Sequence, residues 1–196
     1  MLIAPNRIMH SGAARRAALL AAACLTLALA FAACGDDGGG ADTVALEKEH
    51  DVDVLNQILS RQHAAVDAYD RVLPDLRGKA LVLATGFRSQ EQEHIVAVLE
   101  ALRGLDGSEE VEPEEIASGT LGNEADRLRF LYEVESATIE DEIGAIGRLD
   151  YGGPRALLAA TVANQAQHLV LLRRALGVKP AEAVPSPFED GATPAP

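Results

Sequence analysis

The chain has 196 residues, which is enough for one domain of ordinary size. Hydrophobic residues make up 48% of the chain but aromatic residues only 4%, and this composition, dominated by alanine, leucine, valine, glutamate and arginine, favours helices over sheets. The formal charge of −13 opposes binding to nucleic acid, so the sequence predicts no nucleic-acid partner.

Residues 1–33 have the pattern of an export signal. A basic start with three arginines precedes an apolar run over residues 17–33, which is too short to span a membrane comfortably as a mature helix. The run ends in Leu-Ala-Phe-Ala-Ala-Cys-Gly, which resembles a bacterial lipobox, where cleavage before the cysteine leaves Cys34 to carry lipid. The sequence therefore predicts a protein anchored by lipid to the extracytoplasmic face of the cell membrane. An ordinary secretory signal cut near Ala33 is the alternative.

The regions on either side of the predicted domain are polar or rich in proline. Residues 34–42 contain acids and glycines and are expected to be a flexible tether, and residues 178–196 contain five prolines and are expected to be a disordered tail. The folded domain is therefore predicted over residues 43–177. Both cysteines precede it, so a metal bound in the domain would need carboxylate and imidazole ligands.

Apolar positions that recur at spacings of three and four residues predict four helices. Pro74 ends the first helix, and Asp75 and Asn123 are the expected N-caps of the second and third helices. Pro154 suits the first position of the fourth helix, and Gly177 ends it. The predicted helices cover approximately residues 43–72, 75–102, 123–149 and 154–176.

Four helices with one apolar stripe each bury those stripes most simply as a four-helix bundle. The first and third connections are short, so each joins an antiparallel pair of helices. The middle connection, over residues 105–120, can extend roughly 50 Å. A helix of 28 residues is about 42 Å long, so this connection can run the full length of the bundle. The sequence therefore predicts an all-α fold with up-down-down-up topology and one long crossover between helices 2 and 3.

Polar residues interrupt the apolar stripe near the middle of every helix. On the third helix Glu133 and Glu135 are both candidates, and Glu135 is preferred because it shares the stripe that holds Leu131, Thr138 and Glu142. Glutamate and histidine on a buried face must be paired or hydrogen-bonded. The candidate site residues are Gln62, Glu91 with His94, Glu135, and Gln165 with His168.

This order of residues resembles the ferritin-like superfamily, including its bacterial lipoprotein branch. In that family a glutamate from each of two helices and a Glu-x-x-His motif from each of the other two bind two iron or manganese ions. The resemblance covers about residues 45–176. It implies metal ligands at Glu91, His94, Glu135 and His168, whereas Gln62 and Gln165 stand where it implies carboxylates.

The two glutamines leave different functions open. Glu91 and Glu135 are the two carboxylates in register, and they neutralise one divalent ion, so we expect an altered site that binds at most one iron or manganese ion. Alternatively, Gln62 donates to Glu135 and Gln165 donates to Glu91, and the domain is a metal-free structural or interaction module. An active di-iron or di-manganese oxidoreductase, or an iron oxidant, is the third possibility. Catalysis, a protein partner and the oligomeric state stay open.

Overall fold

The computed structural model describes residues 39–111 and 114–184. The predicted export signal, Cys34 and residues 185–196 of the predicted tail lie outside the described residues. The elements are α2 (Gly39–Val72), the 3-10 helix η1 (Leu73–Asp75), α3 (Gly78–Gly104), α4 (Glu124–Ile146), α5 (Gly152–Ala175) and α6 (Pro180–Ala183).

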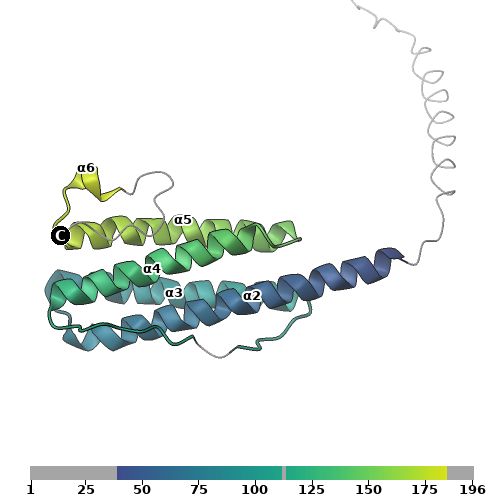
Figure 1. The fold of residues 1–196 in the computed structure, drawn as a ribbon, viewed down its shortest axis with the longest axis horizontal. Helices are drawn as coiled ribbons and strands as arrows, with labels where there is room; N and C mark the ends of the chain where they lie inside the picture. Colours follow the sequence, from purple (N-terminus) through teal and green to yellow (C-terminus); the bar gives the residue numbers. More distant parts are fainter. Residues whose placement is uncertain (1–38, 112–113, 185–196) are drawn as a thin grey trace, which may run out of the picture. The chain divides into compact units, whose positions relative to one another are not determined.

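The four long helices form the predicted up-down-down-up bundle (Figure 1). The crossover between α3 and α4 follows α2 toward the C-terminal end of that helix. Asn56 of α2 donates from Nδ2 to the carbonyl of Ser108 at 3.2 Å and accepts from the amide of Glu110 at 3.2 Å. Arg71, near the end of α2, donates to the carbonyl of Ile116 at 3.0 Å. The crossover returns the chain along α2 to the end of the bundle at which α3 begins. The helix α4 therefore starts at the same end as α3.

Three helix starts differ from the sequence-based expectation, those of α2, α3 and α5. The first helix begins at Gly39, so residues 39–42 are helical and not part of a flexible tether. Asp75 does not cap the second helix, because Pro74 and Asp75 belong to η1 and the N-cap of α3 is Arg77, without a side-chain cap. The fixed φ of proline suits the first turn of a helix, which explains the short turn at this point. The chain then buries Leu76 completely before α3 begins.

The start of α4 agrees with the prediction. Asn123 is the N-cap, its Oδ1 accepts from the amide of Asp126 at 3.0 Å, and the Asp126 carboxylate accepts from the amide of Asn123 at 3.2 Å. This reciprocal pair is a capping box, which satisfies two of the amides that a helix start leaves open. The last long helix, α5, begins at Gly152 with Tyr151 as its N-cap, so Pro154 is its third residue and not the expected first one.

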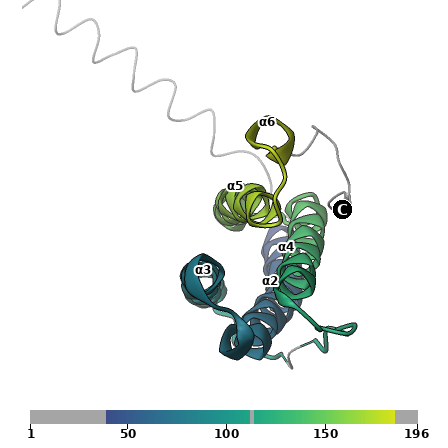
Figure 2. The same cartoon turned by 90° about the vertical axis from the view of Figure 1, so that its left-hand side faces the viewer.

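Part of the predicted C-terminal tail is helical. Residues 180–183 form α6, and Ala183 in it is completely buried. Figure 2 shows α6 beside α5. Val184, which follows α6, lines an apolar hollow together with Val170 and Leu171 of α5. The tail prediction is therefore wrong for residues 180–183, because apolar residues there pack against α5 despite the high proline content.

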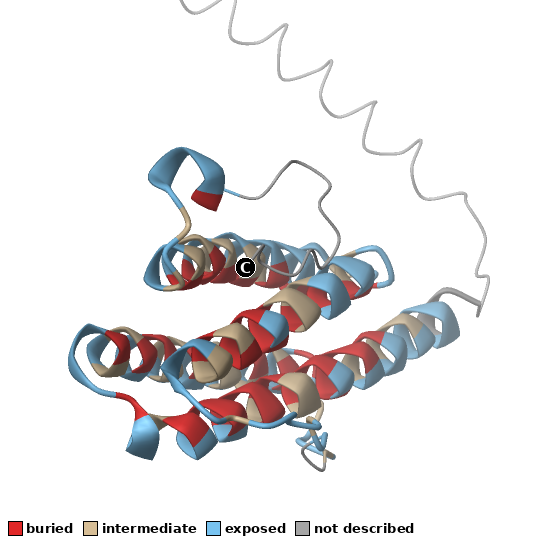
Figure 3. Ribbon diagram, turned by 60° about the vertical axis from the view of Figure 1, so that its left-hand side comes forward, coloured by how far each residue is buried: buried red, intermediate tan, exposed pale blue. Residues whose placement is uncertain are grey.

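The core consists of two apolar clusters with polar residues between them. One cluster contains Tyr69, Phe87 and Leu131, and the other contains Leu59 and Leu158. Along every long helix the polar site positions lie between residues of the first cluster and residues of the second. Buried residues line the facing sides of the helices (Figure 3). None of the described helices is long and apolar enough to cross a membrane.

A buried carboxylate on α2 fixes the start of α5. Asp51 is completely buried, and its two oxygens accept hydrogen bonds from the amides of Asp150 and Tyr151 at 2.7 and 2.9 Å. The negative charge also lies at the N-terminus of α5, where a helix favours an anion. Asp51 therefore ties the turn between α4 and α5 to α2, and this contact helps to set the axial position of α5 in the bundle.

We expect Asp51→Ala to lower the free energy of unfolding by about 1–3 kcal/mol, because it leaves two amides without their acceptor. Urea unfolding followed by circular dichroism measures the change. Asp53→Ala is the matched control, because Asp53 is exposed on the same helix. Equal losses for the two variants would contradict the role given to Asp51.

Candidate metal centre

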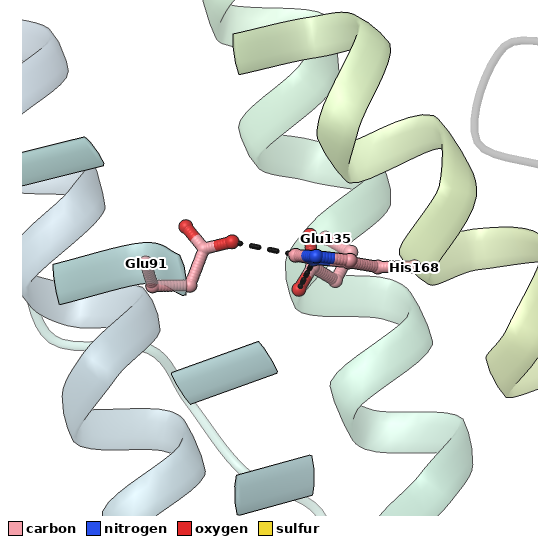
Figure 4. Close-up of side chains that lie close together, drawn as sticks. All are labelled: Glu91, Glu135 and His168. Atoms are coloured by element: carbon pink, nitrogen blue, oxygen red, sulfur yellow. Dashed lines mark hydrogen bonds and ion pairs between the residues drawn. The ribbon is translucent and has the colours of Figure 1, made fainter. Parts of the chain in front are cut away.

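Three buried side chains from three helices meet in the middle of the bundle. Glu91 of α3, Glu135 of α4 and His168 of α5 each offer one ligand atom, and these atoms lie within 4.8 Å of one another. Figure 4 shows the Glu91 carboxylate pointing toward Glu135 and His168. Each of the three residues is at most 1% exposed.

Helical periodicity explains why these side chains point inward. Glu91 follows the buried Phe87 by four residues and precedes the buried Val98 by seven. His168 follows the buried Thr161 by seven residues and precedes Leu172 by four. Residues at these spacings share one face of a helix, so the side chains that build the apolar core also bring the polar ones into it.

His168 contacts both carboxylates through one ring nitrogen. Its Nδ1 lies 3.0 Å from Oε1 of Glu135 and 3.4 Å from Oε1 of Glu91. Its Nε2 lies 2.9 Å from Oε1 of Gln90. The ring stacks on Phe87, with 3.9 Å between the centroids and 22° between the planes. The imidazole is therefore held on both nitrogens and on one face.

Glu91 is held by two neighbours that the sequence also places in the site, Gln165 and His94. Gln165 donates from Nε2 to Oε2 of Glu91 at 3.2 Å, which is the hydrogen bond expected for the metal-free alternative. Nδ1 of His94 lies 3.3 Å from the same oxygen. His94 is partly exposed, so it forms the edge of the site nearest the solvent.

The expected pairing of Gln62 with Glu135 is wrong. Gln62 donates from Nε2 to Oε1 of Glu142 at 2.5 Å, and the hydroxyl of Tyr69 donates to Oε1 of Glu135 at 2.5 Å. The reason is the register of two antiparallel helices: Tyr69 follows Gln62 by seven residues, and Glu135 precedes Glu142 by seven. Glu142, completely buried, is the residue that the predicted site lacked. Its place on the stripe of Glu135 was the signal that could have identified it.

Several oxygens in this layer have no hydrogen-bond partner among the described residues. They are Oε2 of Glu135, Oε1 of Gln165, Oε1 of Gln62 and Oε2 of Glu142. A buried polar atom without a partner costs about 1–3 kcal/mol. The oxygens of Glu135, Gln165 and Gln62 accept hydrogen bonds, so what these three atoms lack is a donor or a cation. Carboxylate oxygens and an imidazole nitrogen are suitable ligands for iron and manganese, so Glu91, Glu135 and His168 fit a divalent ion.

Comparisons with known proteins agree with this arrangement. Residues 50–178 match the family model of the ferritin-like domain. This chain belongs to the ferritin-like domain family. The match covers α2 from residue 50, all of α3, α4 and α5, and every candidate site residue. A search of curated proteins gives no match.

Two solved structures resemble the ferritin-like domain of this chain. One is described as ferritin-like, diiron-carboxylate proteins from Bacillus anthracis str. Ames, with 19% identity, a TM-score of 0.56, and coverage of 66% of this chain and 97% of that chain. The other is a conserved hypothetical protein from Mycobacterium tuberculosis, with 16% identity, a TM-score of 0.60, and coverage of 72% and 99%. At these identities the similarity shows the fold.

Burial and mutual contacts determine the charges in the site of this ferritin-like domain. Burial raises the pKa of Glu142 to about 9, although the hydrogen bond from Gln62 opposes the rise. Burial and the charge of Glu91 also raise the pKa of Glu135. Burial alone would raise the pKa of Glu91, but contacts with His168 and His94 outweigh it and lower this pKa. Glu91 is therefore the carboxylate that stays ionised most readily.

The same contacts keep a proton on the histidine. Burial alone would lower the pKa of His168, but its hydrogen bonds with Glu135 and Glu91 outweigh burial and raise the pKa to about 9. Burial and the nearby Glu135 carboxylate raise the pKa of Tyr69 well above its usual value, so this hydroxyl keeps the proton that it donates. Without a metal, the proton of His168 lies between the two carboxylates at neutral pH.

We expect the metal-free protein to lose stability as the pH rises from about 5 to 9. Glu142 titrates near 4.5 when unfolded and at about 9 when folded, so over this range the folded state binds a proton that the unfolded state does not. His168 adds to the loss above pH 6.5, because its pKa is also raised to about 9 on folding. Glu142→Gln removes one of these groups and should give a smaller loss and a higher melting temperature at pH 8.

Thermal unfolding with a chelator present, at pH 5 and pH 8, measures this difference. The amide of Gln at position 142 can still accept the hydrogen bond from Gln62, so the contact is preserved while the titration is removed. Glu140→Gln, at an exposed position of the same helix, is the control and should follow the wild type. The same pH dependence in Glu142→Gln and the wild type would show that Glu142 is not protonated in the fold.

Proposed function

We propose that this ferritin-like domain binds a single divalent metal ion, iron or manganese, at Glu91, Glu135 and His168. The observation that carries the proposal is the convergence of three buried ligand atoms, from three helices, within 4.8 Å. Two carboxylate oxygens and one imidazole nitrogen are a common donor set for these metals. His94 and Gln165 lie against Glu91 and are the nearest further donors.

The charge of the site favours one ion over two. Glu91 and Glu135 together balance one divalent ion. Glu142 is held by Gln62, and burial favours its neutral form, so it supplies no third negative charge at neutral pH. A second divalent ion would leave positive charge inside an apolar bundle, at a cost on the order of several kcal/mol per ion.

The residues around the triad have roles that follow from their contacts. A bound ion of this class supplies redox or Lewis-acid chemistry. Tyr69 donates to Glu135 and orients that carboxylate, and Phe87 covers one face of the His168 ring and keeps water from it. Gln165 fixes one oxygen of Glu91. These contacts hold the ligand atoms in place before an ion arrives, which reduces the cost of binding it.

A metal-free structural module is the second candidate, and one observation favours it. The contact of His168 Nδ1 with Glu135 and the hydrogen bond from Gln165 to Glu91 pair both carboxylates without an ion. In that state the proton on His168 supplies the positive charge between the two acids. Metal titration separates the two candidates, because the second predicts no tight binding at all.

We expect the full-length protein, purified in mild detergent, to bind one Mn(II) ion per chain. Glu91→Gln and His168→Gln should each weaken metal binding by at least about tenfold. Loss of a residue that only hydrogen-bonds a metal ligand already lowers the affinity by this factor, and loss of the ligand itself should lower it at least as much. Isothermal titration and elemental analysis measure the affinity and the stoichiometry. Glu133→Gln, exposed on α4, is the control. Two tight ions per chain would contradict the single-ion proposal, and no tight ion would support the metal-free module.

We further propose that the domain is exported and held by a lipid anchor at the extracytoplasmic face of the membrane. The support is the sequence of residues 1–34, with its basic start, apolar run and lipobox-like end. The strongly acidic composition should hold the domain away from anionic headgroups.

Cys34→Ala should leave an unprocessed precursor that carries no lipid, because the thiol is the group that is acylated. Metabolic labelling with a radioactive fatty acid and gel mobility in the native host provide the measurement. Cys24→Ala is the matched control, since Cys24 lies inside the apolar run and should be dispensable. Normal cleavage and secretion of Cys34→Ala would show that the signal is an ordinary secretory one.

A further inference from the structure

Gln90 lies directly behind the candidate metal centre, one residue before Glu91 on α3. Its Oε1 is 2.9 Å from Nε2 of His168 and also accepts from Nδ2 of Asn164 at 2.9 Å. Neither Gln90 nor Asn164 belongs to the Glu-x-x-His pattern. Their side chains meet on the side of the His168 ring that points away from the carboxylates.

These contacts determine which hydrogen the imidazole keeps. The atom of Gln90 that accepts from the Asn164 amide nitrogen is its carbonyl oxygen Oε1. The same oxygen faces Nε2 of His168, which must therefore carry a hydrogen to make the contact favourable. The nitrogen left to bind an ion is Nδ1, which already faces Glu91 and Glu135.

We propose that Gln90 is a positioning residue, braced by Asn164, which keeps the hydrogen of His168 on Nε2 and presents Nδ1 to the metal ion. This inference rests on the proposed function, because it names the atom through which His168 binds. Phe87 fixes the plane of the imidazole ring by stacking on it. Gln90 fixes how the ring is rotated within that plane and which of its two nitrogens carries the hydrogen. Residues that hydrogen-bond the other ring nitrogen of a metal-binding histidine act in this way, and their loss weakens metal binding by about 10–100-fold.

The first test is a titration with Mn(II) of the full-length protein in mild detergent. Gln90→Leu removes the acceptor and should weaken binding by about 10–100-fold. Gln90→Glu keeps an acceptor oxygen in the same place and should restore binding close to that of the wild type. Gln92→Leu, at an exposed position of the same helix, is the control and should bind like the wild type.

The second test reads the hydrogen bond directly and needs no bound Mn(II). In NMR spectra of protein labelled with ¹⁵N-histidine, the Nε2–H proton of His168 should be protected from exchange with solvent. The signal of this proton is the one that is missing from the spectrum of His168→Gln. The proton should become unprotected in Gln90→Leu and stay protected in Gln90→Glu. In protein loaded with Zn(II), which is diamagnetic, Nδ1 should carry the metal and Nε2 the hydrogen.

The outcomes separate this inference from the proposed function. Failure of the wild type to bind Mn(II) overturns the proposed function, and the role of Gln90 in metal binding with it. Mn(II) binding that is equally tight in the wild type and Gln90→Leu overturns the inference alone. A hydrogen on Nδ1 with metal on Nε2 in the Zn(II)-loaded protein also overturns the inference alone.

Discussion

The structure depends on a layer of charged and polar side chains buried between two apolar clusters. Glu91, Glu135 and Glu142 are each at most 1% exposed, and an ionised carboxylate in such surroundings is unfavourable unless it is paired. Every one of them has a partner from a different helix: Gln165, His168, Tyr69 or Gln62. Because a one-residue shift of any helix would break such a contact, the polar layer also fixes how the helices are aligned.

These contacts join the helices in a definite order. Gln62 and Tyr69 connect α2 with α4, through Glu142 and Glu135. Gln165 and Asn164 connect α5 with α3, through Glu91 and Gln90. His168 joins the two sets, because its Nδ1 contacts Glu135 of α4 and Glu91 of α3. The residue at the centre of the candidate site is therefore also the residue on which the alignment of three helices converges.

Helical periodicity predicted the four helices and the inward direction of the polar residues, because these features follow from spacing within one helix. The lengths of the connections predicted the topology of the bundle. It could not predict which residues pair across helices. The pairing of Gln62 with Glu142 depends on how far α2 slides along α4, and that distance is set by tertiary packing, including the contact of Asp51 with the start of α5. The short helices η1 and α6 were missed for a similar reason, since burial of Leu76 and Ala183 stabilises them against weak local signals.

The two glutamines supply hydrogen-bond donors to the buried carboxylates of this layer. A carboxylate at position 165 would face Glu91 and would add a buried like charge where an amide now donates a hydrogen bond. A carboxylate at position 62 would face Glu142, whose neutral form burial favours, and would replace the amide donor by a second buried acid. An amide has nearly the shape of the carboxylate, so packing is unchanged while the repulsion is removed. Because both amides are neutral, they add no negative charge to that of Glu91 and Glu135, and this is the basis of the proposal that the site holds one ion. The proposed single-ion site and the alternative metal-free layer therefore both depend on the same two amides.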